Sequence, residues 1–355
     1  MRSFVGPNVE VMAVIKANAY GHGFFQIAEA ATEAGASCLG VAILDEGLRL
    51  RDSGVLCPIV VLGASLPEMA EKTVAADLSA TVSSLPSIRA LQAAARNQGR
   101  KAKIHIKLET GMGRVGAYLE EAIGLVNAVG DDPNVAIEGI ATHIGWTIGP
   151  QAEALSDQIR RFTDSIASLH HHMSVQPRWI HAANSLVTAA EPSGHFDLVR
   201  VGLLTYGISP SPDLAVGQSP LSEITPALSI HARLTQIRTL RPGQTVSYGG
   251  TKVVTRETIA AIVPVGYGDG YPRYPDGGGY VLHRGKQCPI LGTVCMDQMV
   301  IDITDRGASL GDEVVLLGKS GDERLTAVDL ARACGRISYE ILTGLGVRLP
   351  YVYTP

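Results

Sequence analysis

The sequence lacks several features that mark whole classes of protein. It contains no run of about 20 apolar residues, which a membrane-spanning helix requires, and its first seven residues contain no apolar segment of an export signal. No stretch rich in lysine and arginine is found, and the formal net charge is -4. We therefore expect a cytoplasmic protein that binds neither membranes nor nucleic acids.

Cysteine is scarce and follows no metal-binding pattern. The five cysteines include no C-x-x-C pair, and their number is odd. This usage suits a reducing compartment and gives no zinc signature. Three histidines stand together at 170–172, but adjacent side chains on a helix cannot all face one ion. We expect no disulfide framework and no metal site.

The composition is that of a well-buried globular protein. Hydrophobic residues make up 46% and charged residues 18% of the 355 residues, which excludes a disordered chain. The length exceeds what one hydrophobic core usually supports, so we expect two domains, or one barrel with an appendage.

Short β-branched runs alternate with amphipathic helical segments in the first 210 residues. The predicted strands span 11–16, 39–44, 59–63, 78–82, 103–108, 137–143, 178–182 and 197–202. The predicted helices span 24–36, 66–76, 85–96, 120–129 and 151–172. Eight strands in alternation with helices predict a parallel (β/α)8 TIM barrel, with a doubly wound sheet as the alternative.

The alternation of apolar runs and helical segments ends after Tyr206. A stretch rich in proline and serine begins at Ser209 and resembles a linker. Further apolar runs, separated by glycine-rich turns, follow at 259–265, 281–283, 299–303 and 314–317, with one helix predicted at 327–334. We predict a barrel domain at 1–208 and an antiparallel β domain at 209–355.

The segment most informative about chemistry reads Val14-Ile-Lys-Ala-Asn-Ala-Tyr-Gly-His-Gly23. Its lysine, Lys16, ends the first predicted strand, and in a TIM barrel the carboxyl ends of the strands face the active site. A partly desolvated amine there can form a Schiff base with an aldehyde cofactor. On position alone, a lysine in solvent is the commoner interpretation.

This segment resembles the cofactor-lysine motif of the alanine racemase family. Further blocks follow in the order found in that family: 107–116 (KLETGMGRVG), 142–143 (TH), 181–185 (HAANS), 199–203 (VRVGL), 246–251 (VSYGGT), 264–271 (PVGYGDGY) and 295–298 (CMDQ). The resemblance covers nearly the whole chain and both predicted domains. It implies a TIM barrel followed by a β domain, pyridoxal 5'-phosphate as cofactor, and a homodimer with shared active sites.

The resemblance also implies which residues hold the cofactor. Hydroxyls and backbone N–H groups would bind the phosphate, and polar side chains would contact the ring: Lys16, Tyr20, His143, Asn184, Ser185, Arg200, Gly202, Leu203 and Tyr353. Tyr353 is placed by counting from Pro350, because the chain departs there from the usual family ending.

Arg200 is unusual for a pyridoxal enzyme. The resemblance places it against the pyridine nitrogen and places His143 in a hydrogen bond with it. A guanidinium stays charged and cannot accept the proton that most pyridoxal enzymes keep on this nitrogen. A poorer electron sink favours reprotonation, hence racemisation over transamination. Without the motif, a surface ion pair for Arg200 and a satisfied core histidine for His143 are the ordinary interpretations.

Racemisation requires two groups on opposite faces of the substrate α-carbon. The resemblance assigns one face to Lys16 and the other to Tyr248 of the second subunit. The remaining roles are substrate binding by Arg114 and the Met296 N–H, and support by Lys107, Tyr267 and Asp297. Lys107 matches a position that is carbamylated in many members, and the sequence does not separate a carbamate from an ordinary lysine.

The function implied is interconversion of L-alanine and D-alanine, which supplies peptidoglycan synthesis. Serine or a broader range of substrates is an alternative, since pockets discriminate weakly between such similar side chains. A non-catalytic pyridoxal-phosphate carrier would lack the β domain and Tyr248, and a related decarboxylase would place a carboxylate where Arg200 stands. Trp146 replaces the small residues usual after His143, so we expect a narrower entrance.

Overall fold

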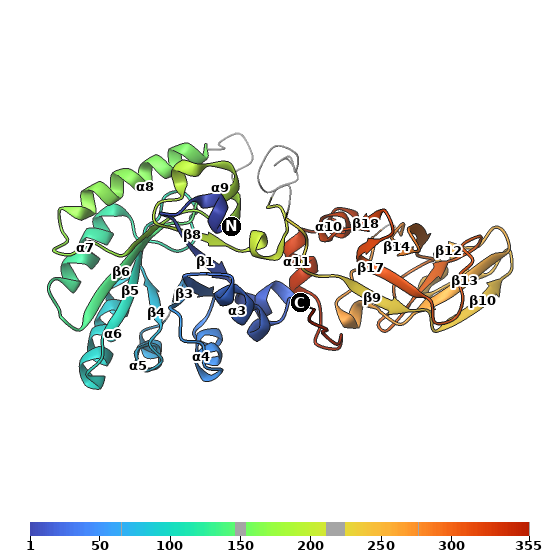
Figure 1. Cartoon of the computed structure of the whole chain (residues 1–355), viewed down its shortest axis with the longest axis horizontal. Coiled ribbons are helices and arrows are strands. Elements are labelled where there is room, and N and C mark those ends of the chain that lie inside the picture. Colours follow the sequence, from blue (N-terminus) through green and yellow to red (C-terminus); the bar gives the residue numbers. More distant parts are fainter. Residues whose placement is uncertain (65, 146–153, 211–223, 276, 355) are drawn as a thin grey trace. The chain divides into compact units, whose positions relative to one another are not determined.

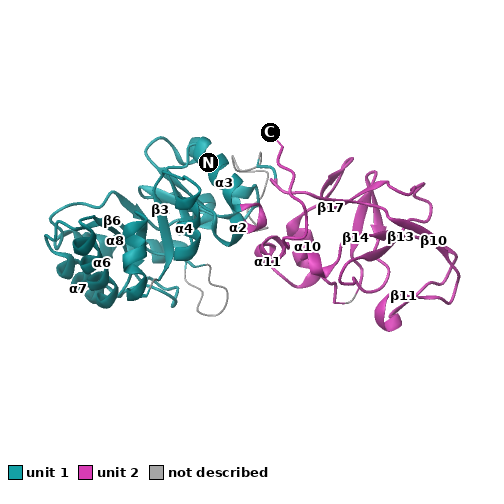
Figure 2. Cartoon of the chain, turned by 90° about the horizontal axis from the view of Figure 1, so that it is seen from below, with its two compact units in different colours: residues 1–19, 24–225 teal, residues 20–23, 226–355 magenta. Residues whose placement is uncertain are grey.

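The computed structural model describes residues 1–64, 66–145, 154–210, 224–275 and 277–354. Contacts divide the chain into two units, which Figure 2 colours separately. The first comprises Met1–Ala19 and Phe24–Thr225, and the second comprises Tyr20–Gly23 and Pro226–Pro355. The predicted boundary at 208 and 209 lies beside residues 211–223, which are outside the described part.

The first unit is a parallel barrel, as the sequence predicts. Its strands are β1 (Glu10–Val14), β2 (Cys38–Val41), β3 (Ile59–Ala64), β4 (Ser79–Val82), β5 (Ala102–Lys107), β6 (Val135–Ala141), β7 (Trp179–His181) and β8 (Leu198–Val201). Strands adjacent in sequence pair in parallel from β1 to β7, and β8 pairs with β1. A doubly wound sheet would reverse its strand order midway, so that alternative is excluded.

Backbone hydrogen bonds join β7 to β8 and nearly close the barrel. Asp197 donates its N–H to Ile180 O at 3.0 Å, and Arg200 donates its N–H to Ala183 O at 2.9 Å. The Asp197 carboxylate in turn accepts the Ile180 N–H at 2.8 Å. This closure fixes Arg200 in the wall of the barrel.

Helices follow most strands and lie outside the sheet (Figure 1). They are α3 (Phe24–Glu33), α4 (Leu44–Asp52), α5 (Ala70–Ala75), α6 (Leu85–Gln98), α7 (Leu119–Val129), α8 (Leu155–His170) and α9 (Ser185–Ala190), with α1 (Arg2–Val5) before β1. Helix α6 illustrates the local rules, because it begins beside Pro86 and ends at Gly99, whose φ of +60° suits a C-cap. The apolar faces pack Ile104, Leu125 and Phe162 into one core.

Two helical predictions need correction. The segment predicted as one helix over 66–76 is a 3-10 turn, Pro67–Met69, followed by α5. Helix α4 was not predicted, because its leucines are interrupted by five charged residues and its length is only nine residues. Long amphipathic segments are recognised more readily than short ones.

The second unit contains the predicted antiparallel sheets. One sheet consists of β10 (Gln236–Leu240), β13 (Thr258–Val263) and β16 (Met299–Asp302). Another consists of β9 (Ile230–Arg233), β14 (Tyr280–His283), β15 (Lys286–Pro289), β17 (Glu313–Ser320) and β18 (Glu323–Leu325). The short strands β11 (Thr245–Val246) and β12 (Lys252–Val253) pair alone.

Local sequence explains several of these elements. Strands β14 and β15 are joined by Arg284 and Gly285, whose φ values of 46° and 72° fit a two-residue hairpin turn. The predicted helix α10 (Ala327–Cys334) begins at Thr326, which accepts the Asp329 N–H at 3.1 Å. A further helix, α11 (Ser338–Thr343), was not predicted. In the described part of the chain, no helix is long and apolar enough to cross a membrane.

Candidate active site

Lys16 lies two residues past the end of β1, immediately before a left-handed turn. The strand ends at Val14 rather than at Lys16, so the predicted strand was two residues too long. From Ala17 to Tyr20 four successive residues have φ between 52° and 54°, which makes the start of α2 (Lys16–Gly21) a left-handed turn. Left-handed geometry costs about 1–2 kcal/mol per non-glycine residue, and such strain is typical of functional sites.

Hydrogen bonds fix the backbone on both sides of this turn. The buried Tyr206 donates its hydroxyl to Val14 O at 3.0 Å, and the Ile15 N–H binds Gly40 O at 2.9 Å. After the turn, Asn18 Oδ1 accepts the Phe24 N–H at 3.0 Å. The lysine backbone is therefore held by neighbouring strands and not by its own segment alone.

Two lysines of the barrel are biased toward their neutral form. Burial lowers the pKa of Lys107 to about 8, assisted by the positive charges of Arg200 and Arg114. Burial also lowers the pKa of Lys16, assisted by Arg114 and Arg200 and opposed by Glu46. A neutral amine is the nucleophilic and basic form of lysine.

Arg200 on β8 is buried and held by both terminal nitrogens. Nη1 donates to His181 Nδ1 at 2.9 Å and to His181 O at 3.0 Å. Nη2 donates to Thr142 O at 2.8 Å and to Ala182 O at 3.0 Å. Nε donates no hydrogen bond to any of the described residues. Burial lowers the pKa of Arg200 to about 10, so the guanidinium remains protonated at neutral pH.

His143 also approaches Arg200, as the resemblance implies, with Nδ1 at 3.5 Å from Nη2. Burial and the Arg200 charge lower the pKa of His143 to about 3. The shorter contact, however, is made by His181, for which the sequence analysis proposed no role. Its pKa is held well below the usual range by burial and by Arg200. Both imidazoles are therefore neutral.

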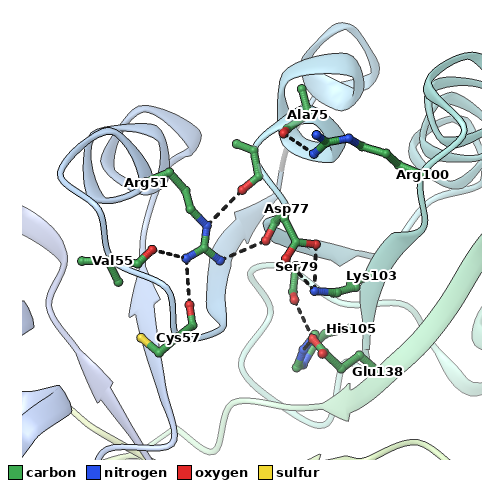
Figure 3. Close-up of polar contacts among 11 residues, drawn as sticks. Arg51, Val55, Cys57, Ala75, Asp77, Ser79, Arg100, Lys103, His105 and Glu138 are labelled. Carbon is green, nitrogen blue, oxygen red and sulfur yellow. Dashed lines mark hydrogen bonds and ion pairs between the residues drawn. The ribbon is translucent and has the colours of Figure 1, made fainter.

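A chain of buried polar groups continues from His181 across the barrel. His181 Nε2 lies 2.8 Å from His105 Nδ1, and His105 Nε2 lies 3.2 Å from Glu138 Oε2. Ser79 donates to the same carboxylate oxygen at 2.5 Å, as Figure 3 shows. A Cβ on Gly139 would clash with the His105 ring, so glycine leaves room for this arrangement.

The residues predicted to bind phosphate in the barrel are brought together. Ser185 Oγ accepts the N–H groups of Gly202 at 2.9 Å and Leu204 at 3.4 Å. Asn184 caps α9 by accepting the Leu186 N–H at 3.0 Å, and its amide donates to Ile144 O at 2.9 Å. Leu203 begins the 3-10 turn that follows Gly202. Hydroxyl and backbone N–H donors thus meet beside the start of α9.

Glu109 shapes the loop that carries Arg114. Its carboxylate accepts the Gly111 N–H at 2.6 Å and the Arg114 N–H at 3.3 Å. Arg161 on α8 donates to Thr110 O, at 3.2 Å from Nε. The Arg114 side chain itself is exposed. The Glu109 carboxylate therefore orders the loop after β5, and the exposed Arg114 remains close enough to act on Lys16 and Lys107 through its charge.

In the second unit, Tyr248 occupies an exposed turn. Its ring is 78% exposed, and the preceding Ser247 has φ 66°. Ser247 Oγ donates to Thr293 O at 2.5 Å and lies 3.2 Å from Cys295 Sγ. These contacts fix the turn from which Tyr248 projects, beside the block that contains Met296.

Three other predicted residues of this unit are neighbours. The Tyr267 N–H binds Cys295 O at 3.0 Å, and the Gly268 N–H binds Met296 O at 2.8 Å. Asp297 pairs with Arg348 at 2.8 Å, and Arg348 also contacts Asp269 at 3.2 Å. Tyr267 and Met296 remain half exposed, at 45% and 52%.

Tyr20 and Tyr353 also belong to the second unit. Tyr20 is buried, and its ring centroid lies 5.9 Å from that of Tyr339. Burial raises the pKa of the Tyr20 hydroxyl. Tyr353 donates its hydroxyl to His22 O at 3.3 Å, while Tyr351 donates to Gly21 O at 2.8 Å. Their convergence on one phosphate with Ser185 stays a prediction. Trp146 lies outside the described residues.

Comparison with known proteins agrees with this geometry. The domain family described as alanine racemase, N-terminal domain, matches residues 1–210, and the one described as alanine racemase, C-terminal domain, matches residues 227–353. The alanine racemase of Carboxydothermus hydrogenoformans is 39% identical over 97% of this chain and 92% of its own length. That of Halothermothrix orenii is 37% identical over 99% of this chain and 92% of its own length.

Solved structures give the same result. The crystal structure of alanine racemase from a D-cycloserine-producing Streptomyces lavendulae has a TM-score of 0.90 and 38% identity, covering 99% of this chain and 92% of its own. The Bacillus anthracis alanine racemase has a TM-score of 0.89 and 34% identity, covering 98% and 89%. Sequence and fold together show that this chain belongs to the alanine racemase family.

Proposed function

We propose that this chain is an alanine racemase that uses pyridoxal 5'-phosphate, works in the cytoplasm as a homodimer with shared active sites, and supplies D-alanine for peptidoglycan. Family membership supports the reaction. One observation carries the proposal for this chain: a partly buried lysine stands past β1 among cations that favour its neutral form, in the same barrel as a buried Arg200 that is held through both terminal nitrogens.

The residues present suit the proposed cofactor. The phosphate would meet the Ser185 hydroxyl and the N–H groups of Gly202 and Leu203, a neutral donor set appropriate for a dianion. Arg200 keeps Nε without a recorded partner in the described chain, so it has one donor left for a ring nitrogen. Pyridoxal phosphate, when bound, draws electrons from the substrate α-carbon and makes its proton acidic.

Residues of the chain would limit how far the bound cofactor acidifies the substrate α-proton. Arg200 has a pKa of about 10, so it would donate to the ring nitrogen of the bound cofactor and could not take up its proton near neutral pH. The neutral His143 and His181 accept from Arg200 and hold the guanidinium in place. Weaker withdrawal of electrons from the α-carbon favours rapid reprotonation of that carbon, which racemisation requires.

Two bases would flank the substrate. The Lys16 amine, whose pKa is lowered by burial, would take a proton from one face, while the Tyr248 hydroxyl of the partner chain would give one to the other. The exposure of Tyr248 in a single chain supports a role toward another subunit. Arg114, the Met296 N–H, Tyr267 and Asp297 would orient the substrate carboxylate and the entrance.

The test is a racemisation assay with purified protein, pyridoxal phosphate and L-alanine, in which D-alanine is detected by a D-amino-acid oxidase. We expect D-alanine with the wild type and none above background with Lys16→Ala. L-serine and other amino acids in parallel decide between narrow and broad specificity. A protein that binds the cofactor but turns over no amino acid would instead be a carrier, and the proposal would fail.

A further inference from the structure

Glu46 links the backbone that follows Lys16 to the backbone that follows β2. It lies in the first turn of α4, directly after β2. One carboxylate oxygen, Oε1, accepts the Ala17 N–H at 2.7 Å. The other, Oε2, accepts the Ala42 N–H at 2.7 Å and the Ile43 N–H at 3.4 Å. One carboxylate therefore holds the residue that follows Lys16 and the residue that follows β2.

The hydrogen bond from the Ala17 N–H to Glu46 matters because Ala17 belongs to the left-handed turn that follows Lys16. Ala17 is the first of the four left-handed residues, and none of them is a glycine that would adopt this geometry without strain. Hydrogen bonds from backbone N–H to a carboxylate are about twice as strong as neutral ones. Glu46 thus opposes relaxation of the turn at the residue adjacent to Lys16.

The charge of Glu46 has a separate effect. The charged groups that act on the Lys16 amine are Arg114 in the loop after β5, Arg200 on β8 and Glu46 on α4. Lys107 on β5 adds a further amine that interacts with Lys16. Glu46 is the one anion among these groups, and its field opposes that of the arginines.

We propose that Glu46 is a positioning residue for Lys16, which it holds through its hydrogen bond with the Ala17 N–H. The inference rests on the proposed function in one respect, namely that Lys16 carries the cofactor. It assigns Glu46 no contact with substrate or cofactor. Two variants test it: Glu46→Gln removes the charge and leaves one acceptor oxygen in place of the two that serve Ala17 and Ala42, and Glu46→Ala removes the charge and both acceptors.

The matched control is Asp45→Asn. Asp45 is the neighbouring residue in the first turn of α4, carries the same charge and is exposed. It therefore reports the effect of losing a negative charge near the start of the helix. Urea unfolding of each variant shows whether it folds, and Glu46→Gln carries the test by itself if Glu46→Ala does not.

The first measurement is the pKa of Lys16 in protein freed of cofactor, obtained from the pH dependence of competitive acetylation read by mass spectrometry. We expect a lower pKa in Glu46→Gln and Glu46→Ala than in the wild type and Asp45→Asn. The second is amide exchange at Ala17, which should accelerate about tenfold or more in Glu46→Ala, because a hydrogen bond to a charged acceptor is lost. In Glu46→Gln, exchange should change less.

Borohydride reduction of the loaded protein, followed by peptide mapping, separates this inference from the proposed function. If the cofactor is fixed to Lys16 but amide exchange at Ala17 in the Glu46 variants equals that in the control, the inference is wrong and the proposed function stands. If the cofactor is fixed to another lysine, the proposed function is wrong, and the role of Glu46 as a positioning residue for the cofactor lysine is wrong with it.

Discussion

Arg200 Nη1 donates a hydrogen bond to His181 Nδ1 across 2.9 Å. A guanidinium has no acceptor, so His181 must accept at Nδ1 and carry its proton on Nε2. That proton faces His105 Nδ1 at 2.8 Å, so His105 in turn carries its proton on Nε2 and donates to Glu138. Two neutral imidazoles thus connect a buried cation with a partly buried carboxylate.

Replacing His181 tests this network. His181→Leu removes one acceptor of Arg200 and the donor to His105, so we expect a loss of about 2–3 kcal/mol in the free energy of unfolding. His181→Gln keeps a donor and an acceptor and should lose less. Urea denaturation at neutral pH measures both, with His172→Leu on the exposed end after α8 as control. Equal stability of His181→Leu and the control would contradict the network.

Lys107 should titrate near pH 8. Burial and the neighbouring guanidinium groups penalise the protonated amine, so the neutral form dominates once the pH rises above about 8. Its reactivity toward an acetylating reagent should rise through this pH in carbonate-free buffer. Arg114→Ala should move the midpoint upward, because it removes a positive charge.

Lys103 on the same strand is the reference for this titration, since its Nζ lies 2.8 Å from the Asp77 carboxylate and not beside an arginine. A Lys107 that becomes reactive only near its ordinary pKa of 10.5 would show that the cations do not act on it. The neutral amine is also the form that reacts with carbon dioxide, so labelled bicarbonate above pH 8 is the condition in which to look for a carbamate.

His143 should stay neutral throughout the physiological range. Its pKa is lowered to about 3 by burial first and by Arg200 second, so protonation begins only in strong acid. We expect its imidazole nitrogen shifts in NMR spectra to stay constant between about pH 5 and 8, the range in which exposed histidines usually titrate. An inflection in that range, absent from His143→Gln spectra, would show that the site is more hydrated or less cationic than the structure indicates.

The barrel was predictable because its signals are local and repeated. Eight apolar runs in alternation with amphipathic helical segments identify the strands, and α6 carries a proline near its start and a glycine at its end. The left-handed turn after Lys16 was not, because of its four residues only Asn18 favours that hand, while alanine and tyrosine rarely adopt it. Tertiary contacts from Asn18 and the neighbouring strands impose it against local preference.

Recognition of the family supplied candidate site residues, but not the buried polar residues that support Arg200. His181 stood at the start of a quoted block, yet its contact with Arg200 depends on the closure between β7 and β8. His105 and Glu138 lie 33 positions apart and meet only because β5 and β6 are neighbours. Strand alternation offered a signal for His105, which lies two residues before Lys107 and so on the same face of β5.

The most direct test of the account asks whether Lys16 and Tyr248 act from different chains. Lys16→Ala and Tyr248→Phe homodimers should each be nearly inactive, since every site lacks one base. A mixed dimer has one site with both lesions and one intact site, and random exchange makes half of the dimers mixed. Co-refolded equal mixtures should therefore recover roughly one quarter of wild-type alanine racemisation. If mixed dimers form, as native mass spectrometry would show, and activity stays at the level of the separate variants, the shared two-base site is contradicted.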